Sequence, residues 1–386
     1  MQYRNFGKLD WKVSALGFGA MRLPLGSNDP AAGNTDVDEP EAIRMIRWAI
    51  DQGLNYLDTA YPYHGGKSEV IVGQALKDGY RDKIKLATKM PSWLIEKYED
   101  FDKFLNEQLE KLKTDHIDFY LFHGLNKQRW PKLTDLGVLK WAEKTIAEGR
   151  IRHLGFSFHD DLETFKRILD DYDNWTLCQI QHNYMDIEYQ AGTKGLKYAA
   201  EKGLAVVIME PLRGGQISKE PPDSVKEIWN SVPLNRTPAD WALQWLWNQP
   251  EVSVVLSGMS TMQQVVENIA SAEHSAIGSL GEKELSLIAE AREQYRKLSP
   301  IPCTSCEYCM PCPNGVDIPH AFHYYNDAMM YNDPRTARFR YREKPKEAWA
   351  DSCIECLECE EKCPQGIPIS EWLKKAHAYL GPRKKN

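Results

Sequence analysis

The chain has 386 residues and a formal net charge of −7, with a sequence pI near 5.9. An acidic balance of this size argues against nonspecific binding to nucleic acid and favours an ordinary soluble protein. No apolar run approaches the roughly 20 residues that a membrane-spanning helix needs, and residues 1–5 lack the apolar core of a signal peptide. We therefore expect a cytoplasmic protein, long enough for one large and one smaller domain.

The beginning of the chain predicts a hairpin, a strand and a loop. Turn residues at 5–10 lie between two short runs, 3–4 and 11–13, which indicates an N-terminal hairpin that could close the bottom of a barrel. Residues 15–20 are the first expected strand, and the glycines in it suit a close approach of another group to the backbone. The stretch 24–34, rich in Gly, Asn and Pro, is expected to be a loop.

Strand-like and helix-like patterns then alternate. Short apolar runs predict strands, and apolar residues three and four apart predict helices. Eight strands that alternate with helices indicate parallel βα units, but the count alone does not distinguish a closed barrel from an open doubly wound sheet. After the first, the expected strands are 54–57, 84–89, 117–123, 151–157, 177–180, 205–208 and 252–256, and the expected helices are 41–51, 68–76, 101–112, 135–147, 161–169, 237–247 and 261–272.

Polar side chains stand at the ends of three of these strands. Asp58 follows the second expected strand, and Tyr63 lies on the loop behind it, where Pro62 and two glycines prevent a helix. A phenol with the usual pKa of about 10 is a poor acid near pH 7, so Tyr63 needs a cation nearby. Lys89 and His123 end the next two strands and are candidates for this help, because the active face of a (β/α)8 barrel collects residues from successive strand ends.

The chain closely resembles the aldo-keto reductase family at four matching places: Asp58, Tyr63, Lys89 and His123. The resemblance covers roughly the first 275 residues. It implies a (β/α)8 TIM barrel of the α/β class rather than an open sheet. It also implies that Tyr63 is the general acid, that Lys89 and Asp58 make Tyr63 easier to ionise, and that His123 orients the carbonyl. Each residue alone would be read as a helix cap or a surface residue.

The resemblance also implies a nicotinamide cofactor, which this family binds without the glycine-rich fingerprint of dinucleotide folds. Ser157 and Gln179 resemble the residues that hold the carboxamide, and the loop 210–215 resembles the loop over the pyrophosphate. Backbone N–H groups at the start of the helix 261–272 suit the phosphate of the adenosine. The positions implied to bind NADP(H) or NAD(H) are Gly19, Ala20, Met21, Asp58, Ser157, Gln179, Leu212, Arg213, Gly258, Gln264 and Asn268.

Three positions depart from the family pattern. Phe158 replaces the Asn that often follows the carboxamide Ser, and Met209 or Glu210 stands where an aromatic residue usually stacks on the nicotinamide. Gln264 stands in the place of the Arg that commonly holds the 2′-phosphate. Because Gln264 cannot act as a bidentate cation, only the habit of the family favours NADP(H), and NAD(H) stays an alternative.

Eight of the nine cysteines fall near the end of the chain, and such crowding in a cytosolic protein suggests metal rather than disulfides. The second group follows C-x2-C-x2-C-x3-C-P, the bacterial ferredoxin pattern for a [4Fe–4S] cluster, and the first is one residue shorter before its last Cys. Zinc is the main competitor, but zinc sites usually pair two C-x2-C halves. The two groups are Cys303, Cys306, Cys309 and Cys312, then Cys353, Cys356, Cys359 and Cys363.

The tail resembles helical two-cluster ferredoxin domains, because the segment 318–330 between the two groups has a helical pattern. In two-cluster ferredoxins the fourth Cys of each group ligates the other cluster. We therefore expect two [4Fe–4S] clusters with exchanged fourth ligands. The first cluster takes Cys303, Cys306, Cys309 and Cys363, and the second takes Cys353, Cys356, Cys359 and Cys312.

The sequence thus predicts an aldo-keto reductase barrel at 1–275, a helical connector at 276–300 and a small, mainly helical ferredoxin-like Fe–S domain at 301–386. The expected activity is NAD(P)-dependent oxidation or reduction of a small carbonyl or alcohol substrate, with electron transfer to a ferredoxin or another redox partner. A hydride carries two electrons and a cluster accepts one, and the sequence has no flavin motif to connect them. Electron transfer between NAD(P)H and a ferredoxin-type carrier, and a nucleotide-binding redox sensor without turnover, are the alternatives.

Overall fold

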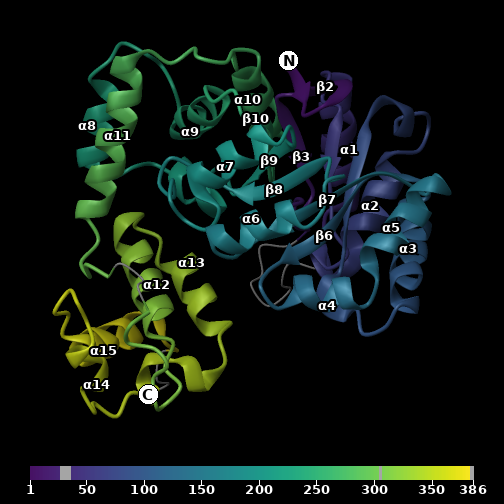
Figure 1. Ribbon diagram of the computed structural model, residues 1–386. Helices are drawn as coiled ribbons and strands as arrows, with labels where there is room; N and C mark the ends of the chain where they lie inside the picture. Colours follow the sequence, from purple (N-terminus) through teal and green to yellow (C-terminus); the bar gives the residue numbers. More distant parts are fainter. Residues whose placement is uncertain (27–35, 304–306, 383–386) are drawn as a thin grey trace. The chain divides into compact units, whose positions relative to one another are not determined.

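The computed structural model describes residues 1–26, 36–303 and 307–382. The chain divides into two compact units (Figure 1). The first comprises Met1–Gly214 and Ala239–Glu282, and the second comprises Gly215–Pro238 and Lys283–Asn386. The second unit therefore includes a segment that lies in the sequence between two strands of the first.

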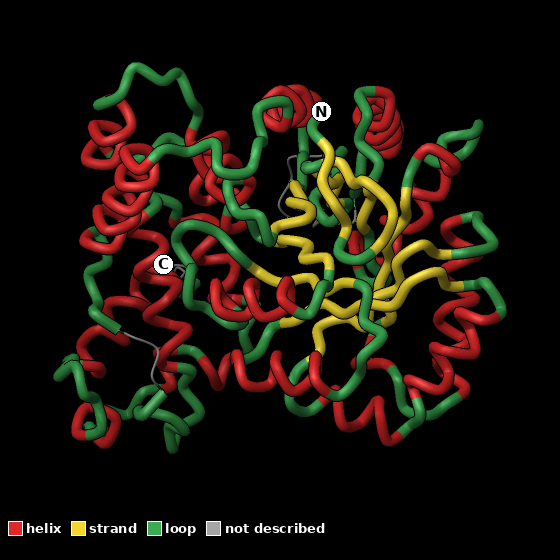
Figure 2. Tube along the Cα trace, turned by 45° about the horizontal axis from the view of Figure 1, so that its top comes forward, coloured by secondary structure: helices red, strands yellow, loops and turns green. Residues whose placement is uncertain are grey.

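The first unit is a closed barrel of eight parallel strands (Figure 2, yellow). Each strand pairs with the next along the chain, and β10 closes the ring by pairing with both β9 and β3. The predicted (β/α)8 barrel is confirmed, and the open sheet is excluded. The barrel strands are β3 (Leu16–Gly19), β4 (Tyr56–Asp58), β5 (Lys85–Met90), β6 (Ile117–Leu125), β7 (Ile151–Phe158), β8 (Leu177–Gln181), β9 (Ala205–Met209) and β10 (Val252–Ser257).

Side chains along each strand alternate between the inside and the outside of the barrel. Tyr56, Ala87 and Leu121 belong to a compact cluster of buried side chains in the barrel interior. The residue two positions farther along each of these three strands points to the same side, at the carboxyl end of the strand. These residues are Asp58, Lys89 and His123.

The hairpin predicted at the beginning of the chain is present as β1 (Tyr3–Phe6) and β2 (Leu9–Ser14), which pair antiparallel. Phe6 joins the interior cluster of the barrel, and its ring centroid lies 4.6 Å from that of Phe119. Phe119 is near the start of β6, so the hairpin closes the amino-terminal end of the barrel. The opposite, carboxyl end is the one that carries the polar strand ends.

Nine α-helices of the described chain lie in the first unit, and one of them, α9, begins one residue before the unit's second segment. Asp38, Asp161 and Thr261 cap three of them, because each side chain accepts a hydrogen bond from a backbone N–H in the first turn. Their bounds are α1 (Glu39–Asp51), α2 (Lys67–Ala75), α3 (Glu99–Leu112), α4 (Arg129–Asp135), α5 (Val138–Ala147), α6 (Leu162–Asp170), α7 (Gly192–Glu201), α9 (Pro238–Trp247) and α10 (Met262–Ala272).

Two details of the expected helices were wrong. The helix expected over 135–147 begins only at Val138, because Gly137 adopts φ +82°, a left-handed conformation that precedes α5, and Asp135 is instead the last residue of α4. The helix expected from residue 68 begins at Lys67 and follows Gly66, so that Ser68 lies inside its first turn. The buried Ser68 hydroxyl bonds to the Ala20 carbonyl and to Thr59 Oγ1, and so connects α2 to the loops behind β3 and β4.

The second unit is mainly helical, as predicted for the tail, and α12 has the expected bounds. A separate hydrophobic core holds it together, formed by residues from Ile301 to Leu380, with cysteines packed at its edge. Arg342 donates to the carbonyls of Leu380 and Gly381 and fastens α13 to the end of α15. The helices are α8 (Asp223–Asn230), α11 (Glu282–Lys297), α12 (Ile318–Met330), α13 (Pro334–Arg342), α14 (Glu358–Glu361) and α15 (Ile369–Leu380).

Across the ranges that the structure describes, we find no helix with the length and apolar character needed to cross a membrane.

Candidate active site

The Lys89 ammonium is the centre of a buried polar chain at the carboxyl end of the barrel. Its Nζ donates to Asp58 Oδ1 at 2.6 Å, to the Thr59 carbonyl at 2.8 Å and to the Tyr63 hydroxyl at 3.4 Å. These three bonds use all three protons of the ammonium. Because the Tyr63 oxygen accepts a proton from Lys89, its own O–H is directed elsewhere. Three of the four residues that carry the family resemblance are thus in contact.

Burial is the largest influence on the ionisation of this chain. It raises the pKa of Tyr63 above 10, although the Lys89 ammonium acts in the opposite direction. Burial alone would lower the pKa of Lys89, but Asp58 and Tyr63 reverse this, so that the Lys89 pKa lies above its usual value. Burial also raises the pKa of Asp58 against the effect of Lys89. Near neutral pH the phenol is therefore protonated and Lys89 is charged.

The expectation that Asp58 itself makes Tyr63 easier to ionise was wrong. The Asp58 carboxylate raises the pKa of Tyr63, because a negative charge nearby disfavours the phenolate. Only Lys89 lowers it. The contribution of Asp58 is therefore indirect, since its carboxylate keeps Lys89 in the charged form.

His123 presents a neutral imidazole beside Tyr63. The two ring centroids are 6.1 Å apart and nearly perpendicular. Burial lowers the pKa of His123 well below 6.5, and the Lys89 charge adds to this. Its Nδ1 is buried and receives no hydrogen bond from any part of the described chain. The Trp93 ring, 5.1 Å from His123 and 38% exposed, borders the site from the loop after β5 and was not expected from the sequence.

A second buried network holds the strand that carries Lys89. Glu69 Oε1 accepts hydrogen bonds from Thr88 Oγ1 at 2.7 Å and from Gln108 Nε2 at 2.5 Å. Gln108 Nε2 also donates to the Lys89 carbonyl at 3.1 Å, and Tyr120 donates to Gln108 Oε1 at 2.7 Å. The network joins α2, α3, β5 and β6 directly behind Lys89, so it fixes the backbone from which the ammonium extends.

Ser157 and Gln179 lie opposite each other on β7 and β8. Ser157 Oγ accepts from the Gly124 N–H at 2.8 Å, which leaves its own proton to be donated. Gln179 Oε1 is buried, and no described residue donates to it. A buried acceptor without a partner is costly, and a ligand amide would supply the donor. The pair therefore offers one donor and one acceptor, which is what a primary carboxamide requires.

The glycines of the expected cofactor surface stand where a side chain would collide. A Cβ at Gly258 would lie 3.1 Å from the Arg22 side chain, and a Cβ at Gly19 would lie 3.3 Å from the Ser257 carbonyl oxygen. Arg22 extends from this point toward Glu210, with 3.7 Å between its Nη2 and the carboxylate. The sequence analysis did not select Arg22, although it follows the first barrel strand directly.

Most of the other residues expected to bind the cofactor lie on α10 and on the loop after β9. At the start of α10, Gln264 Oε1 accepts from the Ser260 N–H at 2.8 Å, while Asn268 is buried and donates to Ser257 Oγ. On the loop after β9, Arg213 Nε donates to Asp186 at 3.0 Å. The remaining positions are Ala20, which donates its N–H to the Asp58 carbonyl, Met21, which is exposed, and Leu212, which packs on the barrel core.

Residues 15–292 match the aldo/keto reductase family. The chain belongs to this family. This aldo/keto reductase is 28% identical over 323 residues to L-galactose dehydrogenase from Arabidopsis thaliana, a match that covers 78% of this chain and 97% of that protein. It is 26% identical over 308 residues to the NADH-specific methylglyoxal reductase of Escherichia coli (strain K12), covering 68% and 91%. Among solved structures, the holo form of aldo-keto reductase AKR11C1 from Bacillus halodurans matches with a TM-score of 0.62 and 28% identity, covering 75% and 96%.

This aldo/keto reductase carries an additional domain, since residues 302–367 match a 4Fe-4S dicluster domain. Cysteines line two cavities of the second unit. Cys303, Cys309 and Cys363 line one, and the other is bordered by Cys309 and Cys312 together with Cys353, Cys356 and Cys359. Cys306 lies outside the described residues. Among the described His, Cys, Asp and Glu side chains, no three are grouped as a site for a single metal ion.

Proposed function

We propose that this aldo/keto reductase moves a hydride between a nicotinamide cofactor and a small carbonyl or alcohol substrate, with Tyr63 exchanging the proton at the substrate oxygen. The observation that carries the proposal is the buried chain from Asp58 through Lys89 to Tyr63. A phenol needs a fixed cation to act as an acid near neutral pH, and this chain supplies one in a place that water does not screen.

Proton transfer depends on the direction of the hydrogen bonds at Tyr63. Lys89 donates to the phenol oxygen, so the phenol proton points away from Lys89, and we place the substrate oxygen in that direction. As the proton leaves, negative charge develops on the oxygen that already faces the ammonium. The charge is stabilised where it forms, which is the condition for catalysis by a preorganised electrostatic environment.

His123 supports the same step as a neutral hydrogen-bond partner. Because burial keeps its pKa well below 6.5, it does not compete with Tyr63 as an acid near pH 7. Its ring stands perpendicular to that of Tyr63, so both can approach one carbonyl oxygen from different sides. We assign His123 to orienting the carbonyl, and Trp93 to limiting the space in front of it.

Ser157 and Gln179 fit the carboxamide of a nicotinamide cofactor. Ser157 has a proton to donate, and the buried Gln179 Oε1 needs a donor. The cofactor, when bound, supplies or accepts the hydride. The start of α10 has no acidic residue in its first turn, which suits the phosphate of the adenosine.

Both NADH and NADPH remain candidate cofactors. The neutral Gln264 at the start of α10 offers no bidentate cation for a 2′-phosphate, and one relative of this chain is an NADH-specific methylglyoxal reductase. NADP(H) was favoured by family habit alone. We therefore propose NAD(P)(H) as the cofactor class.

For the second unit we propose two [4Fe–4S] clusters with exchanged fourth ligands. The two cysteine-lined cavities support this arrangement, because Cys363 borders the cavity with Cys303 and Cys309, while Cys312 borders the one with Cys353, Cys356 and Cys359. Thiolates at this spacing are the donor set that such clusters require. Bound clusters would carry single electrons, which suits exchange with a ferredoxin or a similar redox partner.

A screen of the full chain, purified without oxygen, tests the proposed activity. NADH and NADPH oxidation is followed with a panel of small aldehydes and ketones, and the alcohol formed is quantified. One alcohol formed for each nucleotide oxidised supports the reductase. Tight nucleotide binding without turnover of any carbonyl would favour the redox sensor, and nucleotide oxidation that occurs only with one-electron acceptors would favour the electron-transfer alternative.

A further inference from the structure

A cavity of about 310 Å³ opens at the amino-terminal end of the barrel. It is bordered by the hairpin strand β2 and by the first residues of β5, β6 and β7. Because the strands are parallel, this end is opposite to the one that carries Lys89 and His123. The cavity is therefore separate from the proposed catalytic site, and nothing in the proposed reaction uses it.

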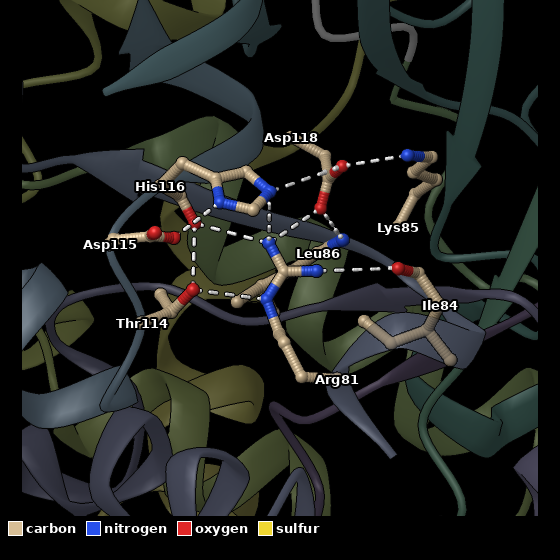
Figure 3. A network of polar contacts seen from close by, with 8 residues as sticks. All are labelled: Arg81, Ile84, Lys85, Leu86, Thr114, Asp115, His116 and Asp118. Carbon is tan, nitrogen blue, oxygen red and sulfur yellow. Dashed lines mark hydrogen bonds and ion pairs between the residues drawn. The ribbon is translucent and has the colours of Figure 1, made fainter. Parts of the chain in front are cut away.

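Asp118 is the only carboxylate among the described residues that border the cavity, and both of its oxygens already contact neighbouring residues (Figure 3). Its Oδ2 accepts from Arg81 at 2.8 Å and from the Leu86 N–H at 3.0 Å, and its Oδ1 lies 3.1 Å from Lys85 Nζ. Burial alone would raise the pKa of Asp118, but Arg81, Leu86 and Lys85 lower it. Arg81 thus neutralises the ionised Asp118, and the charge of Lys85 is in excess.

The His116 ring lies beside this pair (Figure 3). Arg81 Nη2 lies 3.2 Å from His116 Nε2, and a guanidinium can only donate, so Nε2 is the acceptor. The proton is then on Nδ1, which lies 2.6 Å from Asp115. Asp115 keeps its negative charge, but it is directed toward His116 and does not border the cavity.

Two further basic residues face the same space from the start of β7. Arg152 is exposed, and its guanidinium has no hydrogen bond or ion pair with any residue in the described ranges. The His153 ring stacks on Phe119, with centroids 5.4 Å apart and planes at 27°. Two cations, Lys85 and Arg152, thus border the cavity against a single carboxylate that Arg81 already neutralises. Like charges that gather around a hollow without a counter-ion favour the entry of an anion.

We propose that this cavity binds a small aromatic carboxylate, whose carboxylate group meets Lys85 and Arg152 and whose ring lies against Trp11, Phe119 and His153. Three aromatic side chains border the cavity, and an inorganic anion would leave their apolar surface exposed to water. The volume is sufficient for a ligand with one ring. Charge-assisted hydrogen bonds to both basic groups would fix the carboxylate end.

The proposal also implies a direction for the pH dependence of binding. Burial lowers the pKa of His153, with Lys85 and Arg152 acting in the same direction and Asp118 opposing them. His116 and Arg81 are the other titratable groups on the neighbouring elements, and both are held by hydrogen bonds. A bound carboxylate would favour protonated His153, so affinity should increase as the pH falls below 6.5.

Calorimetric titration of the full chain with benzoate tests the site, with the nicotinamide nucleotide present at saturation. We expect Arg152→Gln to weaken benzoate binding about tenfold, as for the loss of one charge-assisted hydrogen bond. Benzyl alcohol and inorganic phosphate should bind more weakly than benzoate. Lys12→Gln is the matched control, because Lys12 bonds Asn5 on the same hairpin and does not border the cavity.

Three results would overturn the proposal: no benzoate binding to the wild type, equal affinity in Arg152→Gln and the wild type, or an equal loss in Lys12→Gln. The last would indicate a general effect of surface charge. Aldehyde turnover by Arg152→Gln should equal that of the wild type. A loss of turnover that accompanies the loss of benzoate binding would place the bound benzoate in the catalytic site and contradict the proposal.

Discussion

Lys89 Nζ lies 2.6 Å from Asp58 Oδ1, and both side chains are almost completely buried. Breaking such a pair leaves a charge in a place that cannot solvate it, so each partner sustains the ionisation of the other. The pair comes from two neighbouring strands, β4 and β5, whose register places Asp58 opposite Ala87. The barrel therefore determines the charge on Lys89, and Lys89 in turn acts on Tyr63.

Replacement of Asp58 tests this dependence. In Asp58→Asn the ammonium loses its counter-ion, so the pKa of Lys89 falls and a smaller fraction of the enzyme carries the charge beside Tyr63. We expect carbonyl reduction at pH 8 to fall roughly 100-fold and to be lost at a lower pH than in the wild type. The pH profile of kcat/KM measures both effects. Asp51→Asn is the control, because Asp51 forms an exposed pair with Lys83, and it should leave the profile unchanged.

The wild-type pH profile has its own predicted form. Burial holds the pKa of Tyr63 above 10 and that of His123 well below 6.5, so neither group changes its charge between about pH 7 and pH 9. Reduction requires the protonated phenol and should stay constant over this range, then fall as the pH rises further. Alcohol oxidation requires the ionised phenol and should increase with pH. An inflection of the reduction rate near pH 6.5 would contradict the neutral role of His123.

Cofactor preference depends on Gln264 at the start of α10. An Arg at this position would add a bidentate cation near the expected 2′-phosphate, and we expect Gln264→Arg to shift the ratio of the NADPH and NADH dissociation constants about tenfold toward NADPH. Fluorescence titration with each nucleotide measures the ratio. Gln263→Arg adds the same charge one residue away, where Gln263 bonds the exposed Glu267. An equal shift in both variants would mean that general charge, rather than the position of Gln264, determines the preference.

The proposed exchange of fourth ligands between the two clusters predicts unequal effects of two cysteine substitutions. Anaerobic iron and sulfide analysis of the wild type should give about eight iron atoms per chain. Cys312→Ser should remove iron from the cluster of Cys353, Cys356 and Cys359 and leave the signals of the other cluster unchanged. Cys178→Ala should retain all the iron, because Cys178 is buried in the barrel core. Zinc in place of iron, or damage by Cys312→Ser to the cluster of Cys303, would contradict the assignment.

Local patterns in the sequence predicted the strands and the positions of their polar ends, whereas the closed barrel was implied by the family resemblance, because eight alternating strands also fit an open sheet. Apolar runs located the strands, and the alternation of side chains carried Asp58, Lys89 and His123 to the same interior end. The start of α5 after Gly137 was not predicted. A glycine inside an apolar pattern does not reveal whether its backbone will adopt a left-handed conformation.

Residues that act through tertiary contacts escaped the prediction. Trp93 lies in a loop without periodicity, and its contact with His123 depends on the path of that loop. Arg22 meets Gly258 only because the barrel closes between β3 and β10. Gln108 did leave a signal, since it is a polar residue at three and four positions from Leu105 and Phe104 on the buried face of α3. A polar residue at such a position indicates a buried hydrogen-bond network.

The most direct test of the proposed mechanism is the single-turnover rate of nucleotide oxidation by Tyr63→Phe with a substrate aldehyde. The substitution removes only the hydroxyl that Lys89 contacts. We predict a rate 100- to 10,000-fold below that of the wild type, the range typical for the loss of a general acid, with nucleotide affinity unchanged. A rate equal to that of the wild type would show that Tyr63 does not supply the proton and would contradict the mechanism.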